Sequence, residues 1–182
     1  MNKNKYVRII SVILLAVVLA FVFRSFLFAS YVVEGRSMEP TLYEGNLLMV
    51  NKVIYNLTDV DRFDVVIFHA NAEDDYVKRV IGLPGDEIEY KNDKLYVNGK
   101  FVEESFLSMF KQGSKKPFTN DFTIEESTGS TKVPRDKLFV LGDNRIESLD
   151  SRAFGFVSTE KLVGKVDVRY WPLKEAQLSF GK

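Results

Sequence analysis

An apolar run opens the chain and differs from everything that follows it. Residues 9–23 are apolar except for Ser11, and apolar side chains continue from Phe26 to Ala29, beyond Arg24. The first fifteen of these residues, at about 1.5 Å each, fall short of a hydrocarbon core of roughly 30 Å, but the continuation makes up the length. We therefore expect residues 1–30 to form a cytoplasmic tip and a transmembrane helix.

The flanking charges give this helix an orientation. Lys3, Lys5 and Arg8 precede the apolar run, and basic residues stay on the cytoplasmic side of a membrane. The N-terminus is thus expected in the cytoplasm and residues 31–182 outside it. The alternative is a cleaved secretory signal, which needs small residues at the last and third-last positions before the cut. Ala29 suits the last position, but Leu27 is too large for the third-last, which favours an uncleaved, single-pass anchor.

β-Structure is predicted for most of the chain after Ser30. Short runs of β-branched and aromatic residues are separated by turn-forming residues. The pairs Asn92-Asp93 and Asn98-Gly99 indicate two hairpin turns within residues 87–102. Apart from the N-terminal run, only a short piece near Ser37 has a helical period. The predicted strands lie at residues 47–50, 65–68, 76–81, 94–97 and 163–171.

Residues 103–132 break this pattern. The segment is rich in Ser, Thr, Lys and Gly, with an apolar patch at Phe106, Leu107, Met109 and Phe110. Long segments of this kind between strands are surface excursions or mobile inserts. We expect a small surface insert within a single β domain that spans residues 31–182.

The composition narrows the chemistry that this domain can perform. The chain has 182 residues, and its 25 Lys and Arg balance 25 Asp and Glu, so no basic field favours nucleic acid. The absence of cysteine excludes disulfides, thiolate metal sites and cysteine nucleophiles. The single histidine excludes a multi-histidine metal site. Any catalytic triad that contains histidine must therefore use His69.

Three segments hold the residues that most favour catalysis. They are residues 35–42, followed by Gly45; residues 76–86; and residues 142–145, followed by Ser148, residues 150–152 and Gly155. In this order, behind an N-terminal apolar run, they resemble the motifs of bacterial type I signal peptidases. A weaker segment at residues 62–68 fits as well. The short chain is similar to the Gram-positive form of the family, which has a reduced second domain.

The resemblance implies a Ser/Lys catalytic pair, in which Ser37 is the nucleophile and Lys78 the general base. A serine hydroxyl needs a base to take its proton. Lysine can do this when desolvation lowers its pKa from about 10.4. The apolar neighbours Tyr76 and Val77 suit that requirement. On residue type alone, Lys78 beside Arg79 is more simply a surface lysine.

Other residues match supporting positions of the family. Ser148 matches a serine that contacts and orients the base lysine. Asp150 and Arg152 match a structural ion pair behind the site. Residues 143–145 are expected to shape the supporting turn.

A further set matches the small, apolar substrate pockets of the family. Core packing is the alternative role for each member. These residues are Tyr31, Val33, Leu42, Tyr76 and Val77.

Gly35 bears on the oxyanion hole. Some family members have serine or threonine here, and that hydroxyl is a second donor to the oxyanion. With glycine, the backbone N–H of Ser37 is the natural first donor, and a second would be another N–H or a water. A special backbone torsion is the other reason for a glycine. We expect an ordinary torsion at Gly35, because residues with a β-carbon occur there in relatives.

A Ser-His-Asp hydrolase is the alternative chemistry. It would need His69, with Asp64 or Asp74 as the partner. His69 follows the predicted strand at residues 65–68, where a loop histidine is ordinary, and no serine-hydrolase elbow is present. The sequence therefore favours lysine as the base.

The resemblance implies a mainly β fold: a transmembrane helix, then an antiparallel β-sheet or coiled-barrel catalytic domain with a small insert. It implies a serine endopeptidase that removes signal peptides from exported preproteins after small residues, with no metal or organic cofactor. The expected partners are preprotein signal peptides, membrane lipid and the secretion translocon, and no nucleic acid. One alternative is a related Ser/Lys protease such as a self-cleaving repressor, which would need a DNA-binding segment. Another is a non-enzymatic, membrane-tethered β module.

Overall fold

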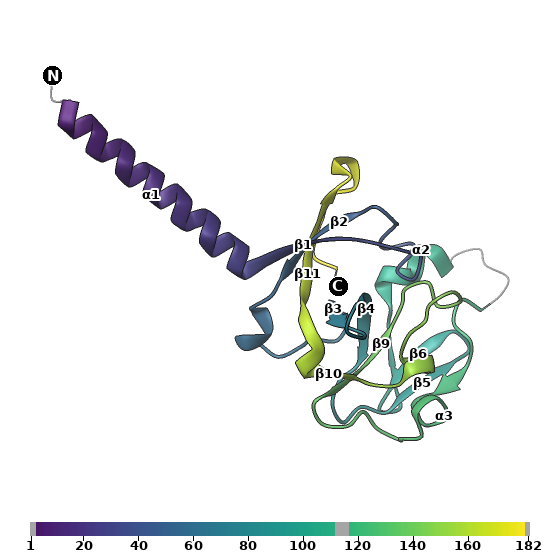
Figure 1. Ribbon diagram of the computed structural model, residues 1–182. Coiled ribbons are helices and arrows are strands. Elements are labelled where there is room, and N and C mark those ends of the chain that lie inside the picture. The colour runs from purple at the N-terminus through teal and green to yellow at the C-terminus, as the bar shows by residue number, and fades with distance from the viewer. Residues whose placement is uncertain (1–2, 112–116, 181–182) are drawn as a thin grey trace.

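The chain begins with one long helix. The computed structural model describes residues 3–111 and 117–180, and its first element is α1 (Lys3–Leu27). This helix projects away from the sheets (Figure 1), with apolar side chains exposed along it. Over the described ranges, no helix combines the length and apolar character needed to cross a bilayer, so the transmembrane assignment is not confirmed. Phe28 and Ala29, which we counted with the apolar stretch, belong to β1 (Phe28–Val32).

A large antiparallel sheet forms the body of the molecule. Its strand order is β1-β2-β11-β3-β4-β9-β10, and β12 pairs with β11. The predicted strands at residues 47–50, 65–68, 76–81 and 163–171 are confirmed, whereas β9 was not predicted. Beyond β1, the strands are β2 (Leu47–Asn51), β3 (Val65–His69), β4 (Asp75–Gly82), β9 (Lys137–Leu141), β10 (Val157–Ser158), β11 (Leu162–Trp171) and β12 (Gln177–Leu178).

A second antiparallel sheet packs beside the first (Figure 1), in the order β7-β6-β5-β8. Both predicted hairpins are present in it. Asn92 and Asn98 have positive φ values of 49° and 52°, which suit the tight turns that they begin. The strands are β5 (Ile88–Lys91), β6 (Lys94–Val97), β7 (Lys100–Val102) and β8 (Phe122–Thr123).

Short helices connect the strands. Thr123 begins α3 with a capping box, in which its side chain accepts from the Glu126 N–H and the Glu126 carboxylate accepts from the Thr123 N–H. Asp150 caps α4 in a similar way by accepting from the Arg152 N–H. The α-helices are α2 (Ser108–Lys111), α3 (Ile124–Thr128) and α4 (Ser151–Phe154), and the 3₁₀ turns are η1 (Ile54–Asn56), η2 (Ser105–Leu107), η3 (Thr159–Lys161) and η4 (Leu173–Glu175).

Residues 103–132, which we expected as a surface insert, contribute to the interior. Leu107 is fully buried, and Ile124 packs in the core of the second sheet. Strand β8 pairs with β5. Residues 112–116 lie outside the described residues, and the side chains of Met109 and Phe110 are not described.

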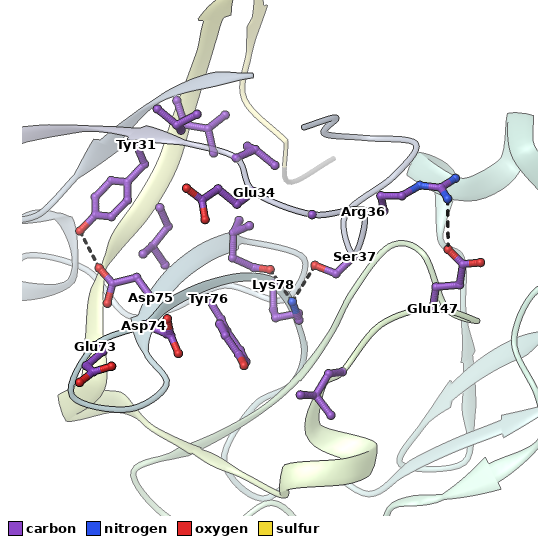
Figure 2. Close-up of a pocket in the computed structure, with 17 residues that line it drawn as sticks. Tyr31, Glu34, Arg36, Ser37, Glu73, Asp74, Asp75, Tyr76, Lys78 and Glu147 are labelled. Carbon is purple, nitrogen blue, oxygen red and sulfur yellow. Dashed lines mark hydrogen bonds and ion pairs between the residues drawn. The ribbon is translucent and has the colours of Figure 1, made fainter. Parts of the chain in front are cut away.

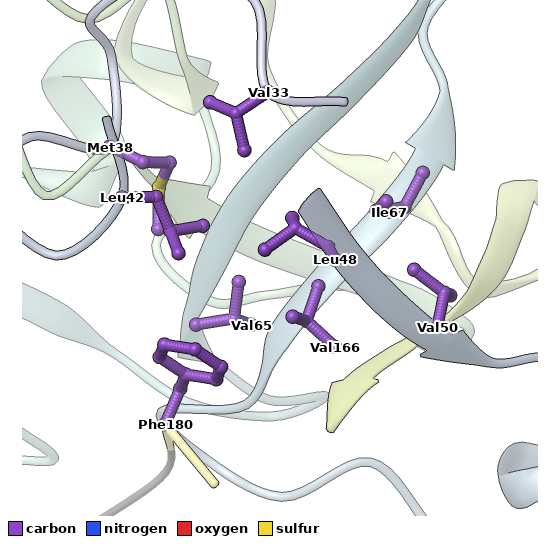
Figure 3. Close-up of a cluster of buried hydrophobic side chains, with 9 residues drawn as sticks. All are labelled: Val33, Met38, Leu42, Leu48, Val50, Val65, Ile67, Val166 and Phe180. Atoms are coloured by element: carbon purple, nitrogen blue, oxygen red, sulfur yellow. The ribbon is translucent and has the colours of Figure 1, made fainter. Parts of the chain in front are cut away.

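The core against the large sheet holds the loop that follows β1. Val33, Met38 and Leu42 from this loop pack with side chains of β2, β3 and β11 (Figure 3). Phe180, near the C-terminus, joins the same cluster. Burial of these apolar side chains stabilises the loop on the sheet. The loop between β1 and β2 is thus fixed by packing as well as by hydrogen bonds.

Strand β4 is paired on both sides along only part of its length. It pairs with β3 from Asp75 to Arg79. Its ladder with β9 begins at Arg79 and runs to Gly82. The first half of β4, Asp75 to Lys78, therefore presents a backbone edge that β9 does not cover.

Candidate active site

Ser37 lies in a compact turn between β1 and β2. The Leu42 N–H donates to the Met38 carbonyl at 2.9 Å, and Met38 is 1% exposed. The short helical piece predicted near Ser37 is a series of turns. The Asn144 N–H donates to the Ser37 carbonyl at 3.0 Å. The backbone that carries the Ser37 hydroxyl is therefore fixed both by its own turn and by the segment at Asn144.

Lys78, on the uncovered half of β4, reaches Ser37. Its Nζ lies 2.8 Å from Ser37 Oγ and donates to the Val77 carbonyl at 3.0 Å (Figure 2). Lys78 is 4% exposed, and this burial lowers its pKa to about 8, against the attraction of the Asp150 and Asp143 carboxylates. Desolvation disfavours the charged ammonium. The amine is thus close to the hydroxyl and partly neutral near physiological pH.

Gly142 is required by the close approach of three chain segments. A β-carbon at this position would collide with the Ser148 hydroxyl and with the Ser37 carbonyl. Ser148 Oγ is buried and has no hydrogen-bond partner within residues 3–111 and 117–180. Ser148 Oγ therefore makes no hydrogen bond to Lys78, the base that it was expected to contact and orient, and it lies instead close to Gly142.

Asp150 is fully buried and joins Arg152 to the turn at Gly142. Arg152 Nε and Nη2 each donate to the carboxylate at 2.8 Å. The Gly142 N–H donates to Asp150 Oδ2 at 3.0 Å. The ion pair that the resemblance implied is present, and it supports the glycine that contacts Ser37.

A second buried ion pair lies behind the site. Arg79 donates to both oxygens of Asp143, at 2.8 and 2.6 Å, and to the carbonyl of Phe180. Thr41 Oγ1 donates to Asp143 Oδ2 at 2.5 Å. Asp143 thus connects β4, the C-terminal segment and the loop that carries Ser37. The sequence placed Asp143 in the supporting turn but did not identify its partners.

Arg145 connects the turn to the second sheet. Its guanidinium donates to Glu104 Oε1 at 2.6 Å, to Tyr90 Oη at 2.7 Å and to the Gly142 carbonyl at 3.0 Å. Tyr90 Oη donates to the same Glu104 oxygen at 2.7 Å. The side chain of Arg145 is fully buried. Glu104 was not predicted from the sequence, because nothing local marks it as buried.

A cleft of about 450 Å³ opens beside Ser37 and Lys78. Of the five predicted pocket residues, Tyr31, Val33, Tyr76 and Val77 line it (Figure 2). Leu42 does not line the cleft; it is fully buried in the core below the Ser37 turn, because its turn directs the side chain inward. Other lining residues that the sequence did not single out are Leu48, Ile67, Asp75 and Leu149.

The only histidine belongs to a different cluster from Ser37. His69 Nδ1 lies 2.6 Å from Asp75 Oδ1, and Tyr31 Oη donates to Asp75 Oδ2 at 3.0 Å. Burial, with the nearby Asp75, raises the pKa of Tyr31 to about 12, so Tyr31 remains a donor. Neither Asp64 nor Asp74 partners His69. The hydrogen-bond partner of the Ser37 hydroxyl is Lys78.

The expectation of an ordinary torsion at Gly35 is wrong. Its φ is +74°, in the left-handed region that L-residues with a side chain rarely adopt. A β-carbon here would meet no atom within 4 Å. The glycine is therefore explained by backbone conformation and not by a lack of space.

The chain is similar to known peptidases over most of its length. The family described as "Signal peptidase, peptidase S26" matches residues 6–171. A signal peptidase I from Bacillus caldolyticus is 59% identical over 149 residues, which are 81% of this chain and 82% of that protein. A signal peptidase IB from Staphylococcus aureus (strain MRSA252) is 46% identical over 155 residues, which are 81% of this chain and 80% of the relative.

A solved structure agrees with these sequence matches. The crystal structure of a signal peptidase I from Enterococcus faecalis V583 has a TM-score of 0.57 and 41% identity. The match covers 60% of this chain and 97% of the other. From the family match and the identities of its relatives, the chain belongs to the signal peptidase family, peptidase S26.

Proposed function

We propose that this chain is a serine endopeptidase that removes signal peptides from exported preproteins, with Ser37 as nucleophile and Lys78 as general base. Membership of the family supports the reaction. The observation that carries the mechanism is the 2.8 Å contact between Lys78 Nζ and Ser37 Oγ, made by a buried lysine. A base must lie within hydrogen-bond reach of the proton that it takes, and must be neutral.

The reaction begins with attack of Ser37 Oγ on the carbonyl carbon of the residue before the cut. The hydroxyl proton passes to neutral Lys78, and negative charge develops on the carbonyl oxygen. Lys78 then returns the proton to the departing amine, which leaves an acyl-enzyme at Ser37. Water attacks this ester and gives a proton to Lys78. The bond between the acyl carbon and Ser37 Oγ then breaks, Lys78 returns the proton to Ser37 Oγ, and the signal peptide leaves with a new carboxyl terminus.

The backbone N–H of Ser37 is the proposed first oxyanion donor. It donates to no group in the described part of the chain, so it is available to a developing oxyanion. Gly35 has no side-chain donor. A second donor would therefore be another backbone N–H or a water. Loss of one oxyanion donor costs about 2.7–4 kcal/mol in comparable sites.

Ser148, Asp150 and Arg152 are proposed as positioning residues. Ser148 Oγ is buried and has no hydrogen-bond partner in the described residues, and it lies at Gly142 together with the Ser37 carbonyl. The Asp150–Arg152 pair holds the Gly142 N–H. We propose that these residues hold Ser37 and Lys78 in place and take no part in the bonds that form or break.

The cleft favours an extended peptide with small side chains. The uncovered edge of β4 can pair with a substrate strand. Tyr31, Val33 and Val77 leave limited apolar space beside that edge. We therefore propose that the last and third-last residues before the cut are small, and that bulky residues there are rejected sterically.

Helix α1 is proposed to hold the enzyme at the membrane, with its N-terminus in the cytoplasm. Its exposed apolar side chains, such as Ile10, Val12 and Leu14, support contact with lipid. The basic residues that precede the apolar run support this orientation. Attachment would place the catalytic domain near the apolar segments of its substrates and raise their effective concentration.

Cleavage of a preprotein by the detergent-solubilised full chain tests this proposal. We expect the wild-type chain to release a mature protein whose new N-terminus follows a small residue, and Ser37→Ala to release none. Ser108→Ala, an exposed serine in α2, is the matched control and should cleave like wild type. Cleavage by Ser37→Ala would refute the proposed nucleophile.

His69→Ala separates the lysine mechanism from the histidine alternative. His69 pairs with Asp75 and does not contact Ser37. We expect its kcat to fall by less than about a hundredfold, the lower end of general-base effects. A larger loss would favour histidine as the base.

A further inference from the structure

A second cavity opens next to the catalytic cleft. Its volume is about 300 Å³, and Tyr76 and Leu149 line both this cavity and the cleft. The Tyr76 ring centroid is 5.2 Å from Lys78 Nζ, and Figure 2 shows the ring beside the Ser37–Lys78 pair. The second cavity therefore begins one side chain away from the reacting atoms.

Successive side chains of β4 point to its two faces, and of the β4 residues only Tyr76 lines both the cleft and the second cavity. Val77 packs on the core that contains Val33 and Leu48. Tyr76, the preceding residue, packs on a different core with Phe68. A substrate strand paired with the uncovered edge of β4 would have the same two faces. Successive substrate side chains would then alternate between them.

This alternation assigns the second cavity to one substrate residue. If the last and third-last residues before the cut enter the cleft on the Val77 side, the second-last residue points to the Tyr76 side. We propose that the second cavity is a subsite for the second-last residue before the cut, and that it favours a long, negatively charged side chain. This inference rests on the proposed function.

The walls of the cavity suit such a side chain. Its floor is aromatic: the ring centroids of Phe68, Tyr76 and Phe154 are 6.2 to 6.4 Å apart. Lys137 and Lys161 also line it, and neither forms an ion pair within the described residues. The methylene groups of a glutamate can pack on the rings while its carboxylate approaches the two ammonium groups.

Three preproteins that differ only at the second-last residue test the inference. With alanine there, cleavage by wild type tests the proposed function alone. With glutamate and lysine, we expect kcat/KM to favour glutamate by about tenfold, the size of two partly exposed ion pairs. Lys137→Glu and Lys161→Glu should each reduce this glutamate-to-lysine ratio, and the double variant should invert it.

Two controls separate a local subsite from a general charge effect. Lys100→Glu in β7 makes the same charge change at an exposed position that lines neither cavity, and it should keep the wild-type ratio. The glutamate-to-lysine exchange at the first residue after the cut should give a ratio that the double variant does not change.

Equal ratios in wild type and the double variant would overturn the inference. A change confined to the residue after the cut would also overturn it, because the cavity would then serve the other side of the cut. Failure of the wild type to cleave the alanine preprotein would refute the proposed function, and the subsite with it.

Discussion

The burial of Lys78 bears both on the catalytic role that we propose for it and on the stability of the fold. With its pKa at about 8, a useful fraction of the amine is neutral near neutral pH. The same desolvation makes the protonated lysine unfavourable in the folded protein. A buried amine of this kind is typical of functional sites, where stability is sacrificed for reactivity.

Lys78→Met should therefore stabilise the fold at pH 7 by on the order of 1 kcal/mol, because it replaces a buried charged side chain with an uncharged side chain of similar length. The folded pKa, about 8, lies below the reference value of 10.5. Between these values the folded state binds fewer protons than the unfolded state, so wild type gains stability relative to the variant as pH rises. Denaturant unfolding from pH 7 to 10.5 should show the gap closing. A gap that widened would contradict the assigned burial effect.

Gly35 gives a second prediction at the residue scale. Its φ of +74° penalises a β-carbon, although no atom lies within 4 Å of one. Gly35→Ala should lower the free energy of unfolding by about 1 kcal/mol, and Gly35→Asn by less, because asparagine tolerates the left-handed region. Gly35→Ser should resemble alanine in stability. If alanine and asparagine proved equally silent, the torsion would not explain this glycine.

The connection between the two sheets depends on elements far apart in the sequence. Glu104 precedes η2, and its carboxylate pairs with Arg145, which follows β9. Both side chains are almost completely buried. Removal of one partner from such a pair leaves an uncompensated charge, and the cost is typically about 3–5 kcal/mol.

Glu104→Gln should therefore destabilise the protein by about 3 kcal/mol in denaturant unfolding. It should also lower activity, because Arg145 holds the Gly142 carbonyl beside the Ser37 turn. Glu103→Gln, an exposed neighbour with the same chemical change, is the control and should be nearly silent. Equal stabilities for the two variants would mean that the buried pair does not support the site.

The elements that could be predicted are those with local signals. The hairpins of the second sheet follow from Asn92-Asp93 and Asn98-Gly99, and the long β11 follows from its alternation. Strand β9 is a short apolar run with no hairpin turn beside it, so its pairing with β4 depends on residues distant in sequence. The polar composition of residues 103–132 favoured a surface position. The burial of Glu104 could not be predicted from this composition, because its partner Arg145 is 41 positions away.

The site residues that could be predicted are those that match the motifs of the family. Ser37 and Lys78 were paired through a family resemblance, and in the structure Lys78 Nζ lies 2.8 Å from Ser37 Oγ. Leu42 was placed wrongly, because a motif does not tell which apolar side chains face a cleft and which face the core. The torsion at Gly35 could not be obtained from residue types in relatives, since occasional β-carbons there do not exclude a left-handed conformation.

At the scale of the whole molecule, we propose separate roles for α1 and the sheets. The helix projects away from the sheets, and β1 begins directly after it (Figure 1). A chain that lacks residues 1–27 should keep its thermal unfolding midpoint within a few degrees and should remain in the aqueous phase of a vesicle flotation assay, whereas the full chain floats. Cleavage of a soluble peptide should persist. A large loss of stability would show that α1 is part of the folded domain.

The proposed mechanism depends most on the Ser37–Lys78 pair, and a double-mutant cycle tests this pair most directly. The kcat for preprotein cleavage would be measured for Ser37→Ala, Lys78→Ala and the double variant, with exposed Lys132→Ala as the control. We predict that each single variant loses at least about a hundredfold and that the double variant is no worse than the weaker single, because the two groups act as one unit. A Lys78→Ala enzyme within tenfold of wild type, or losses that multiply in the double variant, would contradict the proposed mechanism.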